Sequence, residues 1–184
     1  METPIKFAAK FIITLFLSAF LISSNCYSFQ NEPDGFRGIK WGTDITTLKG
    51  MEFLSIDPSI GGIKKYKKTN EELKLGGATL RSVEYSFWRE KFCSITVETE
   101  GSVNWGGLRD ACIEKFGKGL QTNEVNDKFI WLGNIAEIRL DYHESSKKGS
   151  LNILSKNLKT KCFPLTSKKP KMVLQQGFKY KGDL

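Results

Sequence analysis

The sequence predicts an α+β domain in which an antiparallel sheet carries two short helices on one face. Three observations lead to this fold class. Segments 82–98 and 137–142 alternate between apolar and polar side chains, which is typical of strands with one buried and one solvated face. Segment 105–116 places its apolar residues at helical spacing. The 184 residues are 40% hydrophobic and 12% aromatic, which suffices for one folded core and excludes a disordered chain.

Residues 1–28 have the pattern of a secretory signal peptide. Two lysines precede an apolar run over residues 11–22, and small polar residues follow it. The run is short for a bilayer core of about 30 Å; a retained membrane anchor and lipidation at Cys26 are the alternatives. We therefore expect an exported protein, periplasmic or secreted, whose mature chain begins at Phe29.

The positive charge of the chain is concentrated at its C-terminus. The formal net charge is +8, yet residues 29–155 hold eighteen basic and eighteen acidic side chains. Residues 156–184 carry eight lysines against one aspartate. We expect residues 161–184 to form a basic, mobile tail that keeps the protein soluble or makes weak contact with an anionic membrane surface. Nucleic acid is not an expected partner of an exported chain.

Residues 29–160 are expected to form a single domain that opens with the motif F-R-G-I-K-W-G-T at 36–43. Thr43 is a favourable N-cap and Gly50 a favourable terminator, so a first short helix is predicted between them. The lysine-rich segment 63–68 is predicted to be an edge strand, because lysines on an edge oppose pairing with other sheets. A polyanion site is the alternative interpretation of these lysines.

The clearest hairpin runs from residue 76 to residue 99, with its turn at Arg89 and Glu90. Its buried face is expected to hold six apolar residues: Val83, Tyr85, Phe87, Cys93, Ile95 and Val97. A second helix over 105–116 follows the hairpin, capped by Asn104 and ended by Gly117.

The second half of the domain repeats this plan. Strands are predicted at 129–132, 137–142 and 151–153. The two halves, 36–100 and 101–158, therefore read as two tandem α-β-β-β units that share one sheet, and we interpret them as an internal repeat.

Cysteine usage leaves the redox state of the domain open. Without the signal segment the chain has three cysteines, at positions 93, 112 and 162. In an oxidising compartment a helix packed on the sheet can bring Cys93 and Cys112 together, so a disulfide between them is one interpretation. Two buried thiols that never bond are the equally weighted alternative.

The sequence offers little chemistry. It has one histidine, His143, and no close cysteine pair, so no metal site, cofactor or catalytic residue is expected. Asp141 and His143 share the solvated face of one predicted strand, which supports a small exported hydrolase as an alternative function. The Gly-x-Ser-x-Gly nucleophile motif that such an enzyme often uses is absent.

Aromatic residues mark the candidate contact sites for a partner. Trp88 and Arg89 lie at the end of the predicted hairpin, and Trp131 lies in a strand that is apolar on both faces. Tryptophan and arginine are favoured anchors of protein interfaces. These three residues are therefore the candidate partner contacts, and burial of the tryptophans in the core is the alternative interpretation.

Three motifs carry a resemblance to known proteins: the opening at 36–43, Gly76-Gly77-Ala78 before a strand that ends in Tyr85-x-Phe87-Trp88, and Phe116-Gly117-Lys118-Gly119. In these residues the chain resembles a set of small uncharacterised exported bacterial proteins, over about residues 35–158. The paired helix-and-sheet plan is similar to the β-lactamase-inhibitor-protein and outer-membrane-assembly lipoprotein folds. The resemblance implies an envelope or secreted location and a binding module without enzymatic activity. The expected function is thus an envelope accessory protein that contacts an envelope partner.

Overall fold

The computed structural model describes residues 29–58, 62–123 and 127–158, and the structural statements below concern this part of the chain. In chain order its elements are β1 (Gly35–Phe36), β2 (Ile39–Lys40), the 3-10 turn η1 (Ile45–Thr47), β3 (Met51–Asp57), β4 (Ile63–Lys68), β5 (Lys74–Leu75), β6 (Ala78–Thr79), β7 (Ser82–Trp88), β8 (Lys91–Glu100), α2 (Ser102–Phe116), β9 (Leu120–Asn123), β10 (Lys128–Leu132), β11 (Ala136–His143) and β12 (Lys148–Ser155). The predicted signal peptide, Cys26, Cys162 and the basic tail lie outside the described residues.

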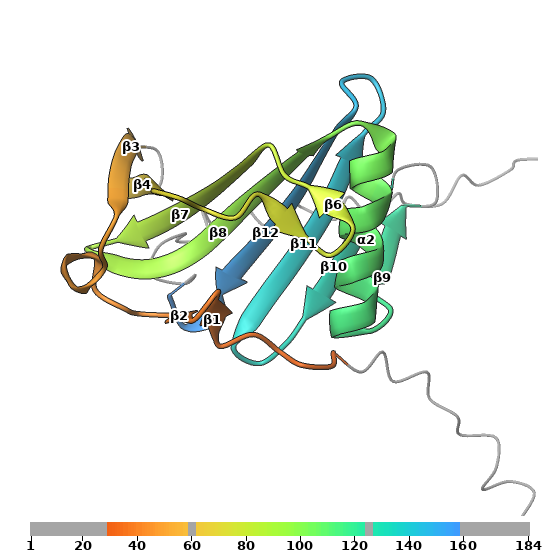
Figure 1. Ribbon diagram of the computed structural model, residues 1–184. Helices are drawn as coiled ribbons and strands as arrows, with labels where there is room; N and C mark the ends of the chain where they lie inside the picture. The colour runs from red at the N-terminus through yellow and green to blue at the C-terminus, as the bar shows by residue number, and fades with distance from the viewer. Residues whose placement is uncertain (1–28, 59–61, 124–126, 159–184) are drawn as a thin grey trace, which may run out of the picture.

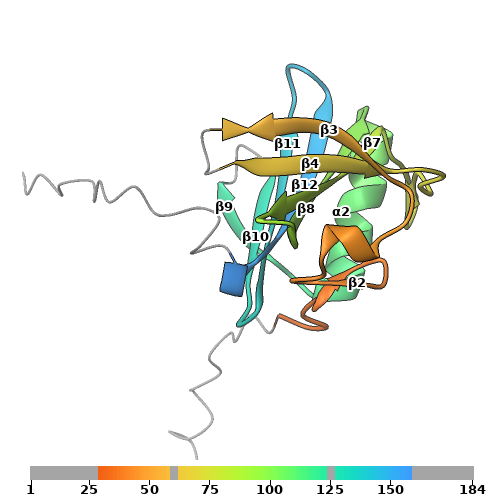
Figure 2. The same ribbon diagram turned by 90° about the vertical axis from the view of Figure 1, so that its left-hand side faces the viewer.

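An antiparallel sheet of eight strands dominates the molecule, in the order β3-β4-β7-β8-β12-β11-β10-β9. The helix α2 lies across one face of this sheet, over its second half (Figures 1 and 2). The predicted α+β class and antiparallel sheet are thereby confirmed. No helix among the described residues is long and apolar enough to cross a membrane.

The prediction of two helices is wrong, because α2 is the single α-helix in the described part of the chain. The segment between Thr43 and Gly50 forms only the turn η1, and Asp44 rather than Thr43 caps it. The Asp44 carboxylate accepts hydrogen bonds from the backbone N–H of Thr46 at 2.9 Å and from its hydroxyl at 2.7 Å. Two β-branched threonines in so short a segment disfavour further helical turns.

The core lies between α2 and the sheet. The largest fully buried side chains of the sheet are Tyr85, Phe87, Phe92, Ile95, Ile138, Leu140 and Leu151. From the helix, Trp105, Leu108, Cys112 and Phe116 complete the core. The alternation in the sequence therefore indicates the buried face correctly for most of these strands.

The strand order is symmetrical about the central pair, β8 and β12. From edge to centre, β3, β4, β7 and β8 form one half of the sheet in chain order, with the β5–β6 hairpin inserted between β4 and β7. The other half runs in chain order from β9 at its edge to β12 at the centre. Each half thus has four strands where three were predicted, since β3 and β9 were missed. The internal repeat stays a prediction, and the two predicted hairpins occupy corresponding positions in the sheet.

No disulfide joins Cys93 to Cys112, which corrects the interpretation from the sequence, and both side chains are buried. The pairing of β7 with β8 shifts register between Ser86 and Phe87, so Phe92 rather than Cys93 enters the core. Cys93 instead packs with Ile63 in a separate small cluster and donates to the Ser86 carbonyl at 3.3 Å. The one extra residue of this β-bulge thus places the Cys93 thiol on the face of the sheet away from α2.

Glycines bring the β5–β6 hairpin into close contact with α2. Gly76 has φ +57°, and a Cβ placed there would lie 2.5 Å from the Cβ of Ala111. A Cβ on Gly107 would lie 2.8 Å from the carbonyl carbon of Gly77. Glycines inside a helix are unfavourable, and here Gly107 permits the backbone contact that holds the hairpin over the helix.

Candidate functional site

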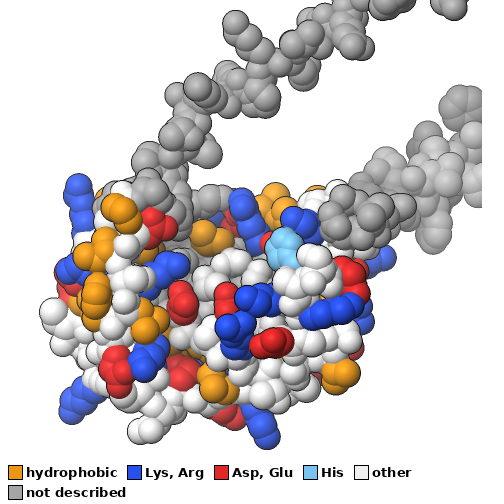
Figure 3. All heavy atoms as spheres, turned by 90° about the horizontal axis from the view of Figure 1, so that it is seen from above, with side chains coloured by type: hydrophobic (Ala, Val, Ile, Leu, Met, Phe, Trp, Pro, Cys, Tyr) orange, Lys and Arg blue, Asp and Glu red, His pale blue; other side chains and the backbone are white. Residues whose placement is uncertain are grey.

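The edge strand β3 exposes a row of large apolar side chains. β3 is the outermost strand of its half of the sheet and pairs only with β4 among the described strands. The exposed fractions of Phe53, Leu54 and Ile56 are 55%, 42% and 52%. Figure 3 shows hydrophobic side chains gathered on the side of the molecule where β3 lies. We call these three residues the β3 edge surface.

Aromatic contacts connect the β3 edge surface to the core. The Phe53 ring meets the Tyr66 ring edge-on at a centroid distance of 5.7 Å. Tyr66 in turn meets Phe87, a fully buried core residue, at 5.3 Å. The pairing of β3 with β4 shifts register between Phe53 and Ser55. Because of this shift, Phe53 and Ile56 lie on the same face of the sheet. Their cross-strand partners on β4 are Tyr66 and Lys64, respectively.

The lysine-rich segment 63–68 is not an edge strand, which corrects the sequence prediction. It forms β4, which lies between β3 and β7. Three of its lysines have carboxylate partners on neighbouring elements, in the ion pairs Lys64–Glu90, Lys65–Glu84 (3.6 Å) and Lys67–Glu52 (3.0 Å). The hydrogen bond that the Lys64 ammonium donates to the Glu90 carboxylate raises the pKa of Lys64. These lysines therefore neutralise nearby acids and do not form an open polyanion site.

The predicted contact residues Trp88 and Arg89 lie together at the β7–β8 turn. The Arg89 guanidinium carbon lies 4.6 Å from the centroid of the Trp88 ring, a cation–π contact. Arg89 is exposed, whereas Trp88 is half-buried against Ile63 and Cys93. Arg89 and Glu90 both have positive φ, as the tight turn between β7 and β8 demands.

Trp131, the third predicted contact residue, lies apart from this corner and is only 3% exposed. Its indole N–H donates to the Gly117 carbonyl at 2.9 Å, and its ring packs near Phe116. The Trp131 ring is therefore part of the core and is not available to a partner. Trp131 is the one buried residue of β10, whereas its neighbour Leu132 is 63% exposed.

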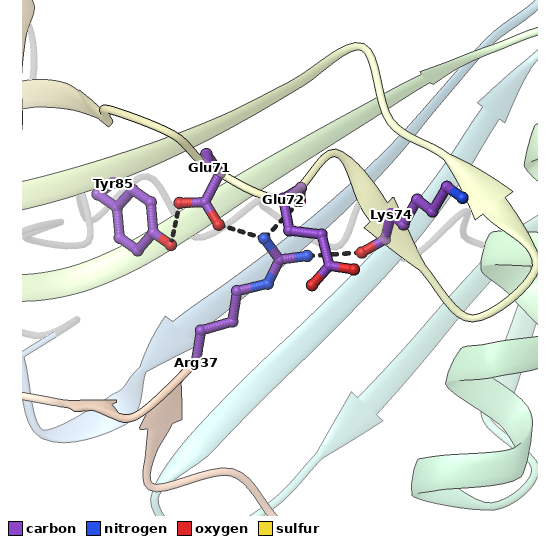
Figure 4. A network of polar contacts seen from close by, with 5 residues as sticks. All are labelled: Arg37, Glu71, Glu72, Lys74 and Tyr85. Atoms are coloured by element: carbon purple, nitrogen blue, oxygen red, sulfur yellow. Dashed lines mark hydrogen bonds and ion pairs between the residues drawn. The ribbon is translucent and has the colours of Figure 1, made fainter.

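A network around Arg37, which the sequence analysis missed, connects three segments (Figure 4). The Arg37 guanidinium forms an ion pair with Glu71 and donates to the carbonyls of Glu72 and Lys74, each at 2.6 Å. The Tyr85 hydroxyl donates to the other Glu71 oxygen at 2.7 Å. Burial and this hydrogen bond raise the pKa of Tyr85. The network ties the loop before β5 to the β1–β2 hairpin and to the sheet.

The positions of Asp141 and His143 do not support the alternative function as a hydrolase. Asp141 forms an ion pair with Lys128 at 3.3 Å, and His143 is exposed opposite Lys148 at the end of β11. Within the described ranges, no group of three or more His, Cys, Asp or Glu side chains is placed to hold a metal ion.

No family model, curated protein or solved structure matches this chain.

Proposed function

We propose that this protein is a non-enzymatic binding protein of the bacterial envelope, and that it captures a partner protein at the β3 edge surface. The observation that carries the proposal is an outermost strand with three large, exposed apolar side chains. Edge strands of this kind are normally protected by charge, proline or a covering element, because their free backbone groups invite another strand.

The contact that best fits this surface is the addition of a partner strand. An extended segment of the partner pairs with the outer backbone groups of β3, and its apolar side chains pack on Phe53 and Ile56. Main-chain hydrogen bonds then supply affinity, and the apolar side chains fix the register. The partner segment is accordingly a strand with apolar side chains on one face.

The Trp88–Arg89 corner provides a second contact at one end of this surface. Ile63, the first residue of β4, pairs with Asp57 at the end of β3 and packs against Trp88. A partner that follows β3 to its end therefore reaches the corner across one strand. The corner lies on the face of the sheet away from α2, whereas Phe53 and Ile56 lie on the face of Tyr66 and Phe87. Trp and Arg are frequent anchors of protein interfaces, so we assign the corner to contacts with the other face of the added partner strand.

The envelope location follows from the signal-peptide pattern of residues 1–28 and from the resemblance to exported proteins. The two alternative functions, as a hydrolase and as a membrane-surface protein, have less structural support. For the hydrolase, Asp141 forms an ion pair with Lys128, and His143 is exposed at the end of β11. Membrane contact through the basic tail concerns residues outside the described ranges.

Mild cross-linking and affinity capture from the host envelope test this proposal. We expect one stoichiometric partner with the wild-type protein and with the control Leu132→Lys, and its loss with Phe53→Lys. Leu132 is a matched control because it is an apolar strand residue with 63% exposure, remote from β3. The proposal fails if Phe53→Lys retains the partner, or if no protein is captured by the wild type.

A further inference from the structure

A cavity of about 580 Å³ lies between the β1–β2 hairpin, the β5–β6 hairpin and α2. Its volume is within the range of roughly 300–1,000 Å³ that small-molecule sites occupy. The glycine contacts at Gly76 and Gly107 fix the β5–β6 hairpin on the helix, and the Arg37 network fixes the loop before β5. The walls of the cavity are therefore held in place from both sides.

The interior of this cavity is apolar. Its walls are formed by residues of β1, β5, α2 and β12: Phe36, Leu75, Cys112, Phe116, Leu151 and Ile153. Burial raises the pKa of the Cys112 thiol to about 12, so this wall residue is uncharged at neutral pH. An interior of this kind favours a hydrocarbon chain over a polar ligand.

The mouth of the cavity is basic. Arg37, Lys74 and Lys115 line it, against one carboxylate, Glu72. Arg37 is engaged by Glu71 and by two backbone carbonyls, and Figure 4 shows the Lys74 ammonium directed away from that network.

Lys74 and Lys115 are the other two cationic residues that line the cavity. The Lys115 ammonium lies 5.7 Å from the ring centroid of Phe116, a residue of the apolar wall. No described carboxylate forms an ion pair with Lys74 or Lys115. A positive charge thus borders the hydrocarbon-lined space directly.

We propose that this cavity binds a long-chain carboxylate, with its alkyl chain against the apolar walls and its carboxylate between Lys74 and Lys115. One monovalent anionic head matches these two cations, whereas Glu72 disfavours a more highly charged head. This site is separate from the β3 edge surface, and the inference does not depend on the proposed function.

Isothermal titration of the purified protein with dodecanoate tests the inference. We expect saturable 1:1 binding that strengthens about fourfold per methylene from octanoate to dodecanoate. Substitution of Lys74 or Lys115 by Gln is expected to weaken dodecanoate binding roughly fivefold each. Lys148→Gln, at the β11–β12 turn and away from the cavity, is the matched control and should leave binding unchanged.

Two further measurements separate this site from a non-specific apolar cleft. Dodecanol and dodecyltrimethylammonium are expected to bind more weakly than dodecanoate, because neither forms the ion pairs. In amide NMR spectra, dodecanoate should shift Leu75 and Cys112 and leave the β3 residues unchanged. The inference is overturned by absence of dodecanoate binding, by equal binding of the three amphiphiles, or by shifts confined to β3.

Discussion

The Arg37 network provides the sharpest test of how the N-terminal hairpin is held to the domain. Arg37→Ala leaves the Glu71 carboxylate without its cation and frees the carbonyls of Glu72 and Lys74. The side chains of Arg37 and Glu71 are 23% and 10% exposed, so the pair is neither fully buried nor open to solvent.

The expected cost follows from that intermediate burial. Breaking a fully buried ion pair costs about 3–5 kcal/mol, whereas an exposed pair contributes about 0.2–1 kcal/mol. Two lost hydrogen bonds to carbonyls add about 0.5–1.5 kcal/mol each. We therefore expect Arg37→Ala to lower the free energy of unfolding by about 3 kcal/mol, as a value between the two limits.

Urea denaturation, followed by far-UV circular dichroism, measures this loss. The matched control is Lys40→Ala on the same hairpin, whose ion pair with Asp34 is 78% and 70% exposed. This control should cost less than about 0.5 kcal/mol. Equal losses for Arg37→Ala and Lys40→Ala would refute the reasoning, because the network would then hold no more than a surface ion pair does.

The remaining predictions concern a glycine contact and the acid stability of the turn η1. Gly76→Ala should destabilise the protein by about 1–3 kcal/mol in urea denaturation, because its Cβ would overlap Ala111 at a positive φ. Gly38→Ala, at φ +81° with open space around it, should cost only about 1 kcal/mol; the reverse order would contradict the contact with α2. Hydrogen bonds from Thr46 and Lys91 lower the pKa of Asp44 from 3.8 to about 2. Since the folded pKa lies below the unfolded one, Asp44 stabilises the fold above pH 4, and this contribution is lost as the pH falls toward 2. Asp44→Asn should therefore flatten the decline in stability over this pH window, and an unchanged pH profile would contradict the role of Asp44.

The elements that the sequence predicted well are those with an unbroken periodic pattern. The alternation at 82–88 predicts β7, the helical spacing at 105–116 predicts most of α2, and the alternation at 137–142 predicts β11. In each of them the same residues that define the pattern also form the core. Burial on one face is thus visible in the sequence wherever the backbone keeps its regular period.

The failures occur where the backbone breaks that period. In β3 the register shift after Phe53 places Phe53 and Ile56 on one face, three positions apart, so no alternation marks the strand. In β8 a similar shift moves Cys93 out of the core and removes the basis for the predicted disulfide. A β-bulge leaves no reliable signal in a single sequence, since any residue can occupy it.

The Arg37 network could not be predicted from the sequence for a different reason. Its side-chain contacts join residues that are 34 and 14 positions apart, Arg37 to Glu71 and Glu71 to Tyr85. No local pattern connects these residues, and Glu71 by itself suggests only a solvated turn. The cavity could not be predicted for the same reason. Lys74 and Lys115 line it together only because β5 packs against α2.

The lysines of β4 show why composition alone does not identify the edge of a sheet. Lysines protect an edge when they lie on the outermost strand. In this protein they lie one strand inside and face the carboxylates of Glu52, Glu84 and Glu90. The outermost strand therefore keeps its apolar side chains exposed, and its bulge interrupts pairing only locally. Such an edge is a template for one more strand, so a second copy of this chain would compete with the proposed partner for the same backbone groups. The Trp88–Arg89 corner lies one strand away from the end of β3, so a partner that engaged both contacts would gain binding energy that β3–β3 pairing alone does not provide.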